Sequence, residues 1–149
     1  MQFSTLFVTV VLAVAAIASP VAPAADVQTS TSIVSEAEMA HFLATTDAEL
    51  TFIGEAINPL AKRSAQTTTV TFCSKRVGNI CGGTCTVYSG GATCLDAANT
   101  VCMSATKDVG FCDETGCNGN CNAMSTCGTQ MGNGFCFTPN TQSILVSSL

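Results

Sequence analysis

Ten cysteines lie between Cys73 and Cys136, and they constrain this chain of 149 residues more than any other feature. An even number of cysteines at this density is typical of a disulfide framework in a small secreted protein. Each disulfide contributes about 2–4 kcal/mol, largely because it restricts the unfolded chain. We therefore predict that all ten are paired: Cys73, Cys81, Cys85, Cys94, Cys102, Cys112, Cys117, Cys121, Cys127 and Cys136.

The cysteines divide into two groups of five, and each group contains two cysteines separated by three residues. These are Cys81 and Cys85 in the first group and Cys117 and Cys121 in the second. Because five is an odd number, at least one disulfide must join the two groups if every cysteine is paired. The spacing alone leaves the full connectivity open.

The first 18 residues predict a secretory signal peptide. Leu6 to Ile17 is an apolar run broken only by Thr9, which suits a signal-peptide core and is too short to span a membrane. Ala16 and Ala18 supply the small residues that a signal peptidase recognises, so we expect cleavage after Ala18. No Lys or Arg precedes the run, which departs from the usual pattern. The sequence predicts a secreted protein without stable membrane insertion.

A dibasic pair, Lys62-Arg63, lies where the composition of the chain changes. Residues 19–63 contain no cysteine and carry most of the acidic charge. Two adjacent cations on an extended segment fit an acidic protease cleft, and the pair in this position resembles a kexin-type processing site. Lys75-Arg76 also matches, but it follows Cys73 and is expected to be held in the folded framework. We predict cleavage after Arg63, giving a propeptide and a mature cysteine-rich domain, residues 64–149. The alternative is a helical hairpin that the mature protein retains.

Two helices are predicted within the propeptide. Ser35 with Glu38, and Thr46 with Glu49, each form the S/T-x-x-E pattern of a capping box. Apolar side chains follow each start at helical spacing. The residue before Pro59 is pushed out of the helical region, which ends the second helix. The apolar stripes are Met39, Phe42 and Leu43 in the first helix, and Leu50, Ile53 and Ile57 in the second.

The cysteine-rich segment is predicted to be mainly β with short strands. Its frequent glycines mark turns, and β-branched and aromatic residues between them favour strands. At most one short helix is expected, over Leu95–Met103, because Asp96 stands at its start as a cap and two alanines follow. The predicted fold class is a small disulfide-rich, mainly β domain with a helical propeptide. The predicted strands are Ser64–Thr71, Thr86–Tyr88, Val109–Phe111, Gly134–Phe137 and Ser143–Val146.

The sequence shows no catalytic constellation. His41, the only histidine, lies in the predicted propeptide, so the mature chain lacks the base that His-dependent catalysis needs. Asp113 and Glu114 are adjacent in a predicted turn, and adjacent loop carboxylates rarely converge on one substrate atom. Asp108 is interpreted as surface charge. We predict a non-enzymatic protein with no catalytic residue.

Composition also narrows the partners. Zinc is the rival interpretation of closely spaced cysteines, but the predicted secretion and the absence of histidine after Ser64 argue against it, so neither metal nor cofactor is predicted. The formal charge is -5 for the whole chain, and most of it precedes Ser64. A nearly neutral product lacks the basic patch that phosphate backbones demand, which excludes nucleic acid. We expect a monomer that meets an extracellular target, either a protein or a polysaccharide.

Amide side chains are frequent in the second cysteine group. Amides and aromatic rings suit sugar recognition, but the same residues are ordinary turn formers, and the turn interpretation is favoured. The amides are Asn118, Asn120, Asn122, Gln130, Asn133 and Asn140, with Tyr88, Phe135 and Phe137 as candidate stacking rings.

The succession of leader, acidic spacer, Lys62-Arg63 and ten-cysteine product resembles the small secreted cysteine-rich proteins of filamentous fungi, which include effector-like and toxin-like molecules. The likeness covers the layout of the whole chain and includes no diagnostic motif. It implies a non-enzymatic, effector-like or toxin-like protein that acts outside the cell. The alternatives are a binding module (a protease inhibitor or a cell-wall polysaccharide binder) and a structural protein of the fungal surface.

Overall fold

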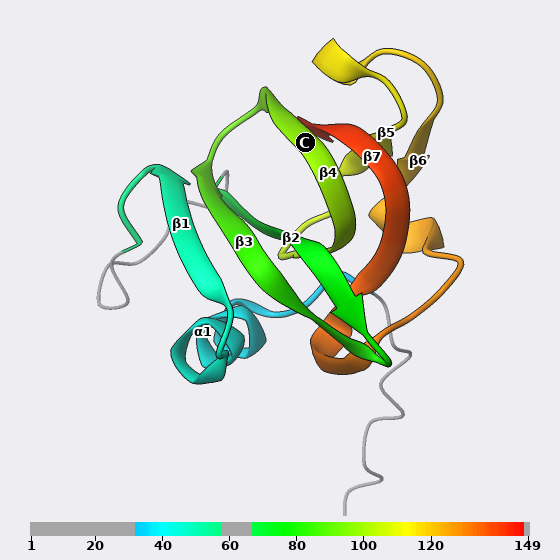
Figure 1. Ribbon diagram of the computed structural model, residues 1–149. Helices are drawn as coiled ribbons and strands as arrows, with labels where there is room; N and C mark the ends of the chain where they lie inside the picture. The colour runs from blue at the N-terminus through cyan, green and yellow to red at the C-terminus, as the bar shows by residue number, and fades with distance from the viewer. Residues whose placement is uncertain (1–31, 58–66, 148–149) are drawn as a thin grey trace, which may run out of the picture.

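The computed structural model describes residues 32–57 and 67–147. The predicted signal peptide with Ala18, and the predicted cleavage position at Lys62-Arg63, lie outside these residues. A seven-stranded sheet in the order β1-β3-β2-β4-β7-β5-β6 dominates the described part, with α1 beside the start of β1 (Figure 1). The elements are α1 (Glu36–Thr45), β1 (Glu49–Gly54), β2 (Thr68–Val77), β3 (Ile80–Gly90), β4 (Thr93–Ala105), β5 (Gly110–Cys112), η1 (Thr115–Cys117), β6 (Cys121–Ala123), η2 (Met124–Thr126), η3 (Gly132–Gly134) and β7 (Cys136–Val146).

The predicted mainly β, disulfide-rich fold class is confirmed. The helix predicted over Leu95–Met103 is wrong, because these residues belong to β4. Leu95 and Ala97 are buried while Asp96 and Ala98 are exposed, which is the two-residue period of a strand. Asp96 is therefore not a helix cap; its carboxylate accepts the Ala98 N–H at 3.2 Å. Hydrogen bonding to β2 and β7 on either side outweighs the helix propensity of two alanines.

The first predicted helix is confirmed as α1, and its capping box forms as expected. Glu38 N–H donates to Ser35 Oγ at 3.2 Å, and Ser35 N–H donates to Glu38 Oε2 at 2.7 Å. Met39 and Phe42 face the interior and are buried. The sequence pattern therefore predicts both where this helix begins and which face it buries.

The second predicted helix is wrong, because residues 49–54 form β1. Thr46 is the C-terminal cap of α1, and its hydroxyl accepts the Ala48 N–H at 3.2 Å instead of starting a new helix. Thr, Phe and Ile in this stretch favour a strand, and a short isolated helix is marginal in water. Parallel pairing with β3 supplies the backbone partners that decide the outcome.

The two strands predicted near the C-terminus are one element, β7. A register shift opposite β4 lies between Thr100 and Cys102, and Asn140 adopts φ 64° there. Asparagine tolerates this left-handed conformation better than most residues, which permits a bulge without ending the strand. β2, β3, β4 and β7 are longer than the short strands predicted, whereas β5 and β6 are short, with three residues each.

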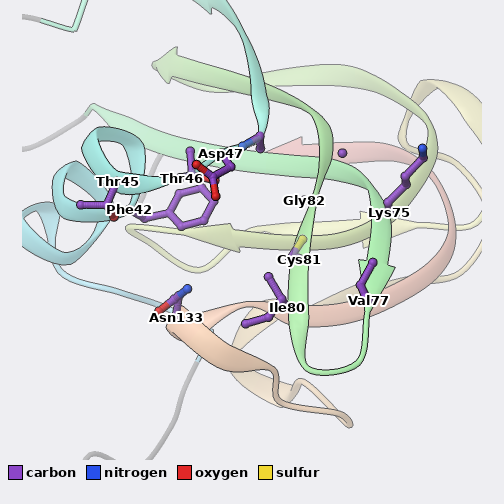
Figure 2. A pocket seen from close by; sticks show the side chains of 12 residues that line it. Phe42, Thr45, Thr46, Asp47, Lys75, Val77, Ile80, Cys81, Gly82 and Asn133 are labelled. Carbon is purple, nitrogen blue, oxygen red and sulfur yellow. Dashed lines mark hydrogen bonds between the residues drawn. The ribbon is translucent and has the colours of Figure 1, made fainter.

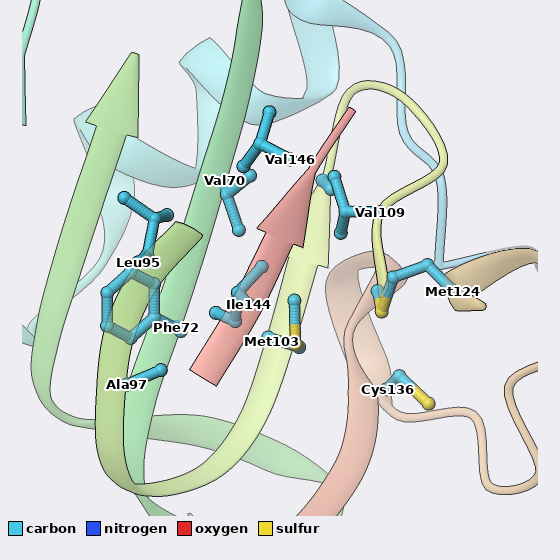
Figure 3. Close-up of a cluster of buried hydrophobic side chains, with 11 residues drawn as sticks. Val70, Phe72, Leu95, Ala97, Met103, Val109, Met124, Cys136, Ile144 and Val146 are labelled. Carbon is cyan, nitrogen blue, oxygen red and sulfur yellow. The ribbon is translucent and has the colours of Figure 1, made fainter. Parts of the chain in front are cut away.

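The larger of two hydrophobic clusters lies among β2, β4 and β7. Met103, Met124 and Ile144 are fully buried within it, and Figure 3 shows these side chains converging from different elements. Unbranched methionines fill irregular gaps, which suits a chain without tryptophan. The cluster comprises Val70, Phe72, Leu95, Ala97, Met103, Ala105, Val109, Met124, Cys136, Ile144 and Val146.

The second cluster is built around two disulfides. Cys73, Cys81, Cys85 and Cys102 are all buried, and the Phe42, Met131 and Phe135 side chains pack with them. Phe42 comes from α1, whereas Met131 and Phe135 flank η3. Sulfur and aromatic rings therefore supply a second core where the chain has few large aliphatic side chains.

All ten cysteines lie within the described residues and all are paired. Four disulfides each join two cysteines of the same group, two in each group. The fifth, Cys94–Cys117, joins the two groups, as the odd number in each group requires. The other pairs are Cys73–Cys85, Cys81–Cys102, Cys112–Cys121 and Cys127–Cys136.

Reduction is expected to unfold the protein at 25 °C. Five bridges at about 2–4 kcal/mol each together equal or exceed the whole stability of a typical small domain. Circular dichroism of the oxidised protein, recorded before and after reduction and alkylation, should show loss of the β signal. A reduced, alkylated chain that keeps its spectrum and its thermal transition would contradict this expectation.

Candidate functional site

The β2–β3 hairpin ends in two exposed apolar side chains. Val77 is 77% exposed and Ile80 is 57% exposed, and the two face each other across a two-residue turn. Gly78 has φ 60°, which suits the first position of a tight hairpin turn and is uncommon for residues with a side chain. The strands therefore present these side chains at the tip of a hairpin.

This hairpin tip is held from several directions. The Arg76 guanidinium lies 4.4 Å from the centre of the Phe137 ring, and Arg76 Nε–H donates to the Gly78 carbonyl at 2.8 Å. Gly132 N–H, at the start of η3, donates to the Asn79 carbonyl at 2.9 Å. Because these contacts fix the turn to the Phe137 ring and to η3, Val77 and Ile80 are exposed on an ordered hairpin, which we call braced.

Two disulfides anchor the same hairpin. Cys73–Cys85 joins β2 to β3 directly, and Cys81–Cys102 joins β3 to β4 across β2. Lys75-Arg76 lies between these anchors in β2 and pairs with β3. The prediction that this second dibasic pair is held in the framework is confirmed.

An open groove of about 410 Å³ adjoins the hairpin. Figure 2 shows Ile80 and Val77 on one side and Phe42 with Asp47 on the other. Lys75 and Asp47 contribute one charge of each sign to an otherwise largely apolar lining. The lining residues are Phe42, Thr45, Thr46, Asp47, Ala48, Lys75, Val77, Ile80, Cys81, Gly82, Gly83 and Asn133.

Of the three rings that are candidates for sugar stacking, Phe135 is buried, whereas Tyr88 and Phe137 are half-buried. Phe135 is 1% exposed within the second cluster, and Phe137 lies beneath Arg76. Tyr88 is half-buried and its hydroxyl donates to the Gly91 carbonyl at 2.8 Å. Burial, followed by the nearby Glu55 carboxylate, raises the pKa of Tyr88 above its ordinary value. Phe52 on β1, which the sequence analysis did not single out, is 57% exposed.

Several amides serve turns, as the favoured interpretation predicts. Asn118 Nδ2–H donates to the Thr115 carbonyl at 3.1 Å, and Asn133 adopts φ 58° within η3. Gln130 instead accepts the Ser32 hydroxyl at 2.9 Å. Asn118 thus organises a local turn, whereas Gln130 ties two segments that are 98 residues apart in the sequence.

The paired carboxylates do not form a joint acidic site. Asp113 accepts Asn120 N–H at 2.8 Å and Asn120 Nδ2–H at 3.0 Å, which closes the loop between β5 and β6. Hydrogen bonds from the Asn120 side chain and then its backbone hold the pKa of Asp113 below its ordinary value. Glu114 contributes its backbone carbonyl, which accepts the Ser143 hydroxyl.

The remaining candidate polar residues stand apart from one another. His41 is exposed on α1. Asp108 accepts Ser125 N–H at 3.0 Å and the Ser125 hydroxyl at 2.6 Å, so it serves the η2 turn instead of standing as an isolated surface charge. Within residues 32–57 and 67–147, no three His, Cys, Asp or Glu side chains are grouped to hold a metal ion. The helices of that same part include none with the length and apolar character to cross a membrane.

Comparison with protein-family models, curated proteins and solved structures finds no match for this chain.

The Asp113 carboxylate is expected to stabilise its loop in a pH-dependent way. Its folded pKa lies below the unfolded value of about 3.9, so the stabilisation is complete above that value and is lost as the pH falls through the folded pKa. Asp113→Asn should increase hydrogen exchange at the Asn120 backbone amide several-fold at pH 6. It should also abolish the loss of protection of that amide, relative to an unfolded chain, as the pH falls. Glu114→Gln removes a neighbouring charge but neither hydrogen bond, and should leave Asn120 unchanged. Equal exchange in both variants would contradict this role.

Proposed function

We propose that this chain is a secreted, non-enzymatic, effector-like or toxin-like protein that acts outside the cell by binding another protein through its β2–β3 hairpin tip. The observation that carries the proposal is the exposure of Val77 and Ile80 on a support braced by two disulfides, Arg76 and η3. The five disulfides independently support an extracellular-type small protein.

A braced apolar tip favours binding for an energetic reason. Association costs conformational freedom at the interface, and a hairpin that is already ordered loses little of it. Burying Val77 and Ile80 against a partner then contributes through removal of apolar surface from water. The neighbouring groove enlarges the surface that a partner would cover.

Protein is favoured over polysaccharide as the partner. Val77 and Ile80 are aliphatic and offer no flat ring for a sugar face, the Phe135 ring is buried, and Arg76 lies over the Phe137 ring. Protein interfaces, in contrast, bury aliphatic and aromatic side chains together at their centres. Phe52 on β1 is an exposed ring that could stack on a sugar. Binding to cell-wall polysaccharide is therefore measured in the experiment below.

A protease inhibitor that inserts this hairpin as an extended substrate is less well supported. The backbone of Lys75, Arg76 and Val77 is already paired with β3 across the turn. A substrate-like loop needs free backbone groups to pair with the protease. A hairpin contact outside a protease cleft agrees better with this geometry.

The double variant Val77→Ser with Ile80→Ser tests the proposal. Applied to plant, bacterial and fungal cells, the unaltered secreted protein should change growth or viability of at least one, and the variant should need about 10-fold more protein, equivalent to about 1.4 kcal/mol. Leu145→Ser is the matched control, because Leu145 is 41% exposed on β7 and should be near neutral.

Intact mass shows whether each variant retains five disulfides, and an unchanged circular dichroism spectrum shows that it is folded. Inertness of the unaltered protein toward all three cell types would contradict effector-like or toxin-like action. Full activity of the double variant would contradict the hairpin as the contact surface. If insoluble chitin or glucan pulls the protein down and Phe52→Ala abolishes this binding, the partner is a polysaccharide and the proposed protein partner is wrong.

A further inference from the structure

Residues 49–54 complete the sheet at one edge. β1 pairs in parallel with β3 along its whole length, and Glu55 N–H donates to the Ser89 carbonyl at 2.7 Å. Gly54 has φ 84° and approaches so closely that a Cβ there would lie 2.3 Å from the Ser89 carbonyl oxygen. Backbone groups of β3 that would otherwise form a free sheet edge are therefore covered by β1.

The helix of the same segment closes the cluster around the two buried disulfides. The Phe42 ring centre lies 4.7 Å from that of Phe135, and Phe42 is only 7% exposed. Met39 is 2% exposed, and its sulfur accepts the Thr71 hydroxyl of β2 at 3.2 Å. Without α1, Phe135 and the neighbouring cystines would lose their apolar cover.

A third contact lies ahead of the helix. Val34 N–H donates to the Ala105 carbonyl at 2.9 Å, and Ala105 N–H donates to the Ser32 carbonyl at 3.2 Å. Val34 also packs on Gly134, where an added Cβ would lie 2.2 Å from Val34 Cγ1. This stretch is therefore fitted to a position where only glycine leaves enough room.

We infer that residues 32–57 act as a non-covalent subunit of the fold, which stays bound when the chain is cut at Lys62-Arg63 and makes the processed product a two-chain complex. No cysteine lies in this segment, so no disulfide can hold it. Three separate contacts do so instead: the β1–β3 pairing, the packing of α1 and the bridge to Ala105. The cysteine-rich body, residues 67–147, thus binds a segment of its own precursor, residues 32–57.

This inference is tested with the full chain. A Gly/Ser linker that contains one site for a sequence-specific protease is inserted directly after Arg63, and the protein is purified after secretion. After cutting, native mass spectrometry and size exclusion without denaturant should show both pieces together. Denaturant without reductant should separate them, because no disulfide joins them. Separation in native buffer at micromolar concentration would overturn the inference, whether the larger piece then stays folded or aggregates.

Matched variants test whether the observed packing holds the segment. Phe42→Ala should speed dissociation of the cut complex by about 100-fold or more, since removing a buried ring leaves a cavity. Phe52→Ala on the same segment removes a ring that is 57% exposed and should change the rate by less than about 3-fold. Equal rates for these two variants would overturn the inference.

A second pair of variants places the change in the cysteine-rich body and keeps the test decisive if Phe42→Ala is not secreted. Gly134→Ala strains a φ of 72° and collides with Val34, so it should also release the segment. Gly78→Ala strains a similar φ of 60° but meets nothing within 4 Å, and should leave the complex intact. Release by both variants, or by neither, would contradict the contact with Val34.

Discussion

The fold depends on two disulfides buried in a hydrophobic cluster. Cys73–Cys85 and Cys81–Cys102 fasten three adjacent strands, and their sulfurs form the centre against which Phe42 and Phe135 pack. The chain has one tyrosine and no tryptophan, so phenylalanine and methionine are the largest side chains buried in its core. Cystine therefore acts here both as a covalent tie and as apolar filling, which explains why hairpin, helix and η3 all meet at this point.

The cysteine content and local capping chemistry made part of this structure predictable. The need for one disulfide between the two groups follows from their odd number, and Cys94–Cys117 meets it. Ser35 and Glu38 start α1 because a capping box acts through contacts within a few residues. Leu95–Met103 and residues 49–54 were predicted as helices and are strands, since pairing with distant strands decided both. The hairpin site was missed: the exposure of Val77 and Ile80 depends on tertiary packing, and their Gly-Asn turn was the only local signal.

The segment ahead of the cysteines has the composition of a removable propeptide and also forms part of the fold. Its composition predicts a removable spacer, whereas residues 32–57 supply a strand, a helix and part of the cover over the second cluster. Phe42 and Asp47 of this segment also line the groove beside the hairpin tip. Under the cleavage and retention proposed above, packing of residues 32–57 would keep the groove beside the hairpin tip intact after the chain is cut.

Disulfide mapping of the unreduced protein tests this account most directly. Proteolysis without reductant, followed by mass spectrometry of the linked peptides, should recover Cys73–Cys85 and Cys81–Cys102, with Cys94–Cys117 joining the two groups. Alkylation before proteolysis should find no free thiol. Recovery of Cys81 or Cys102 with a different partner, or as a free thiol, would contradict the disulfide-centred cluster on which the fold is explained.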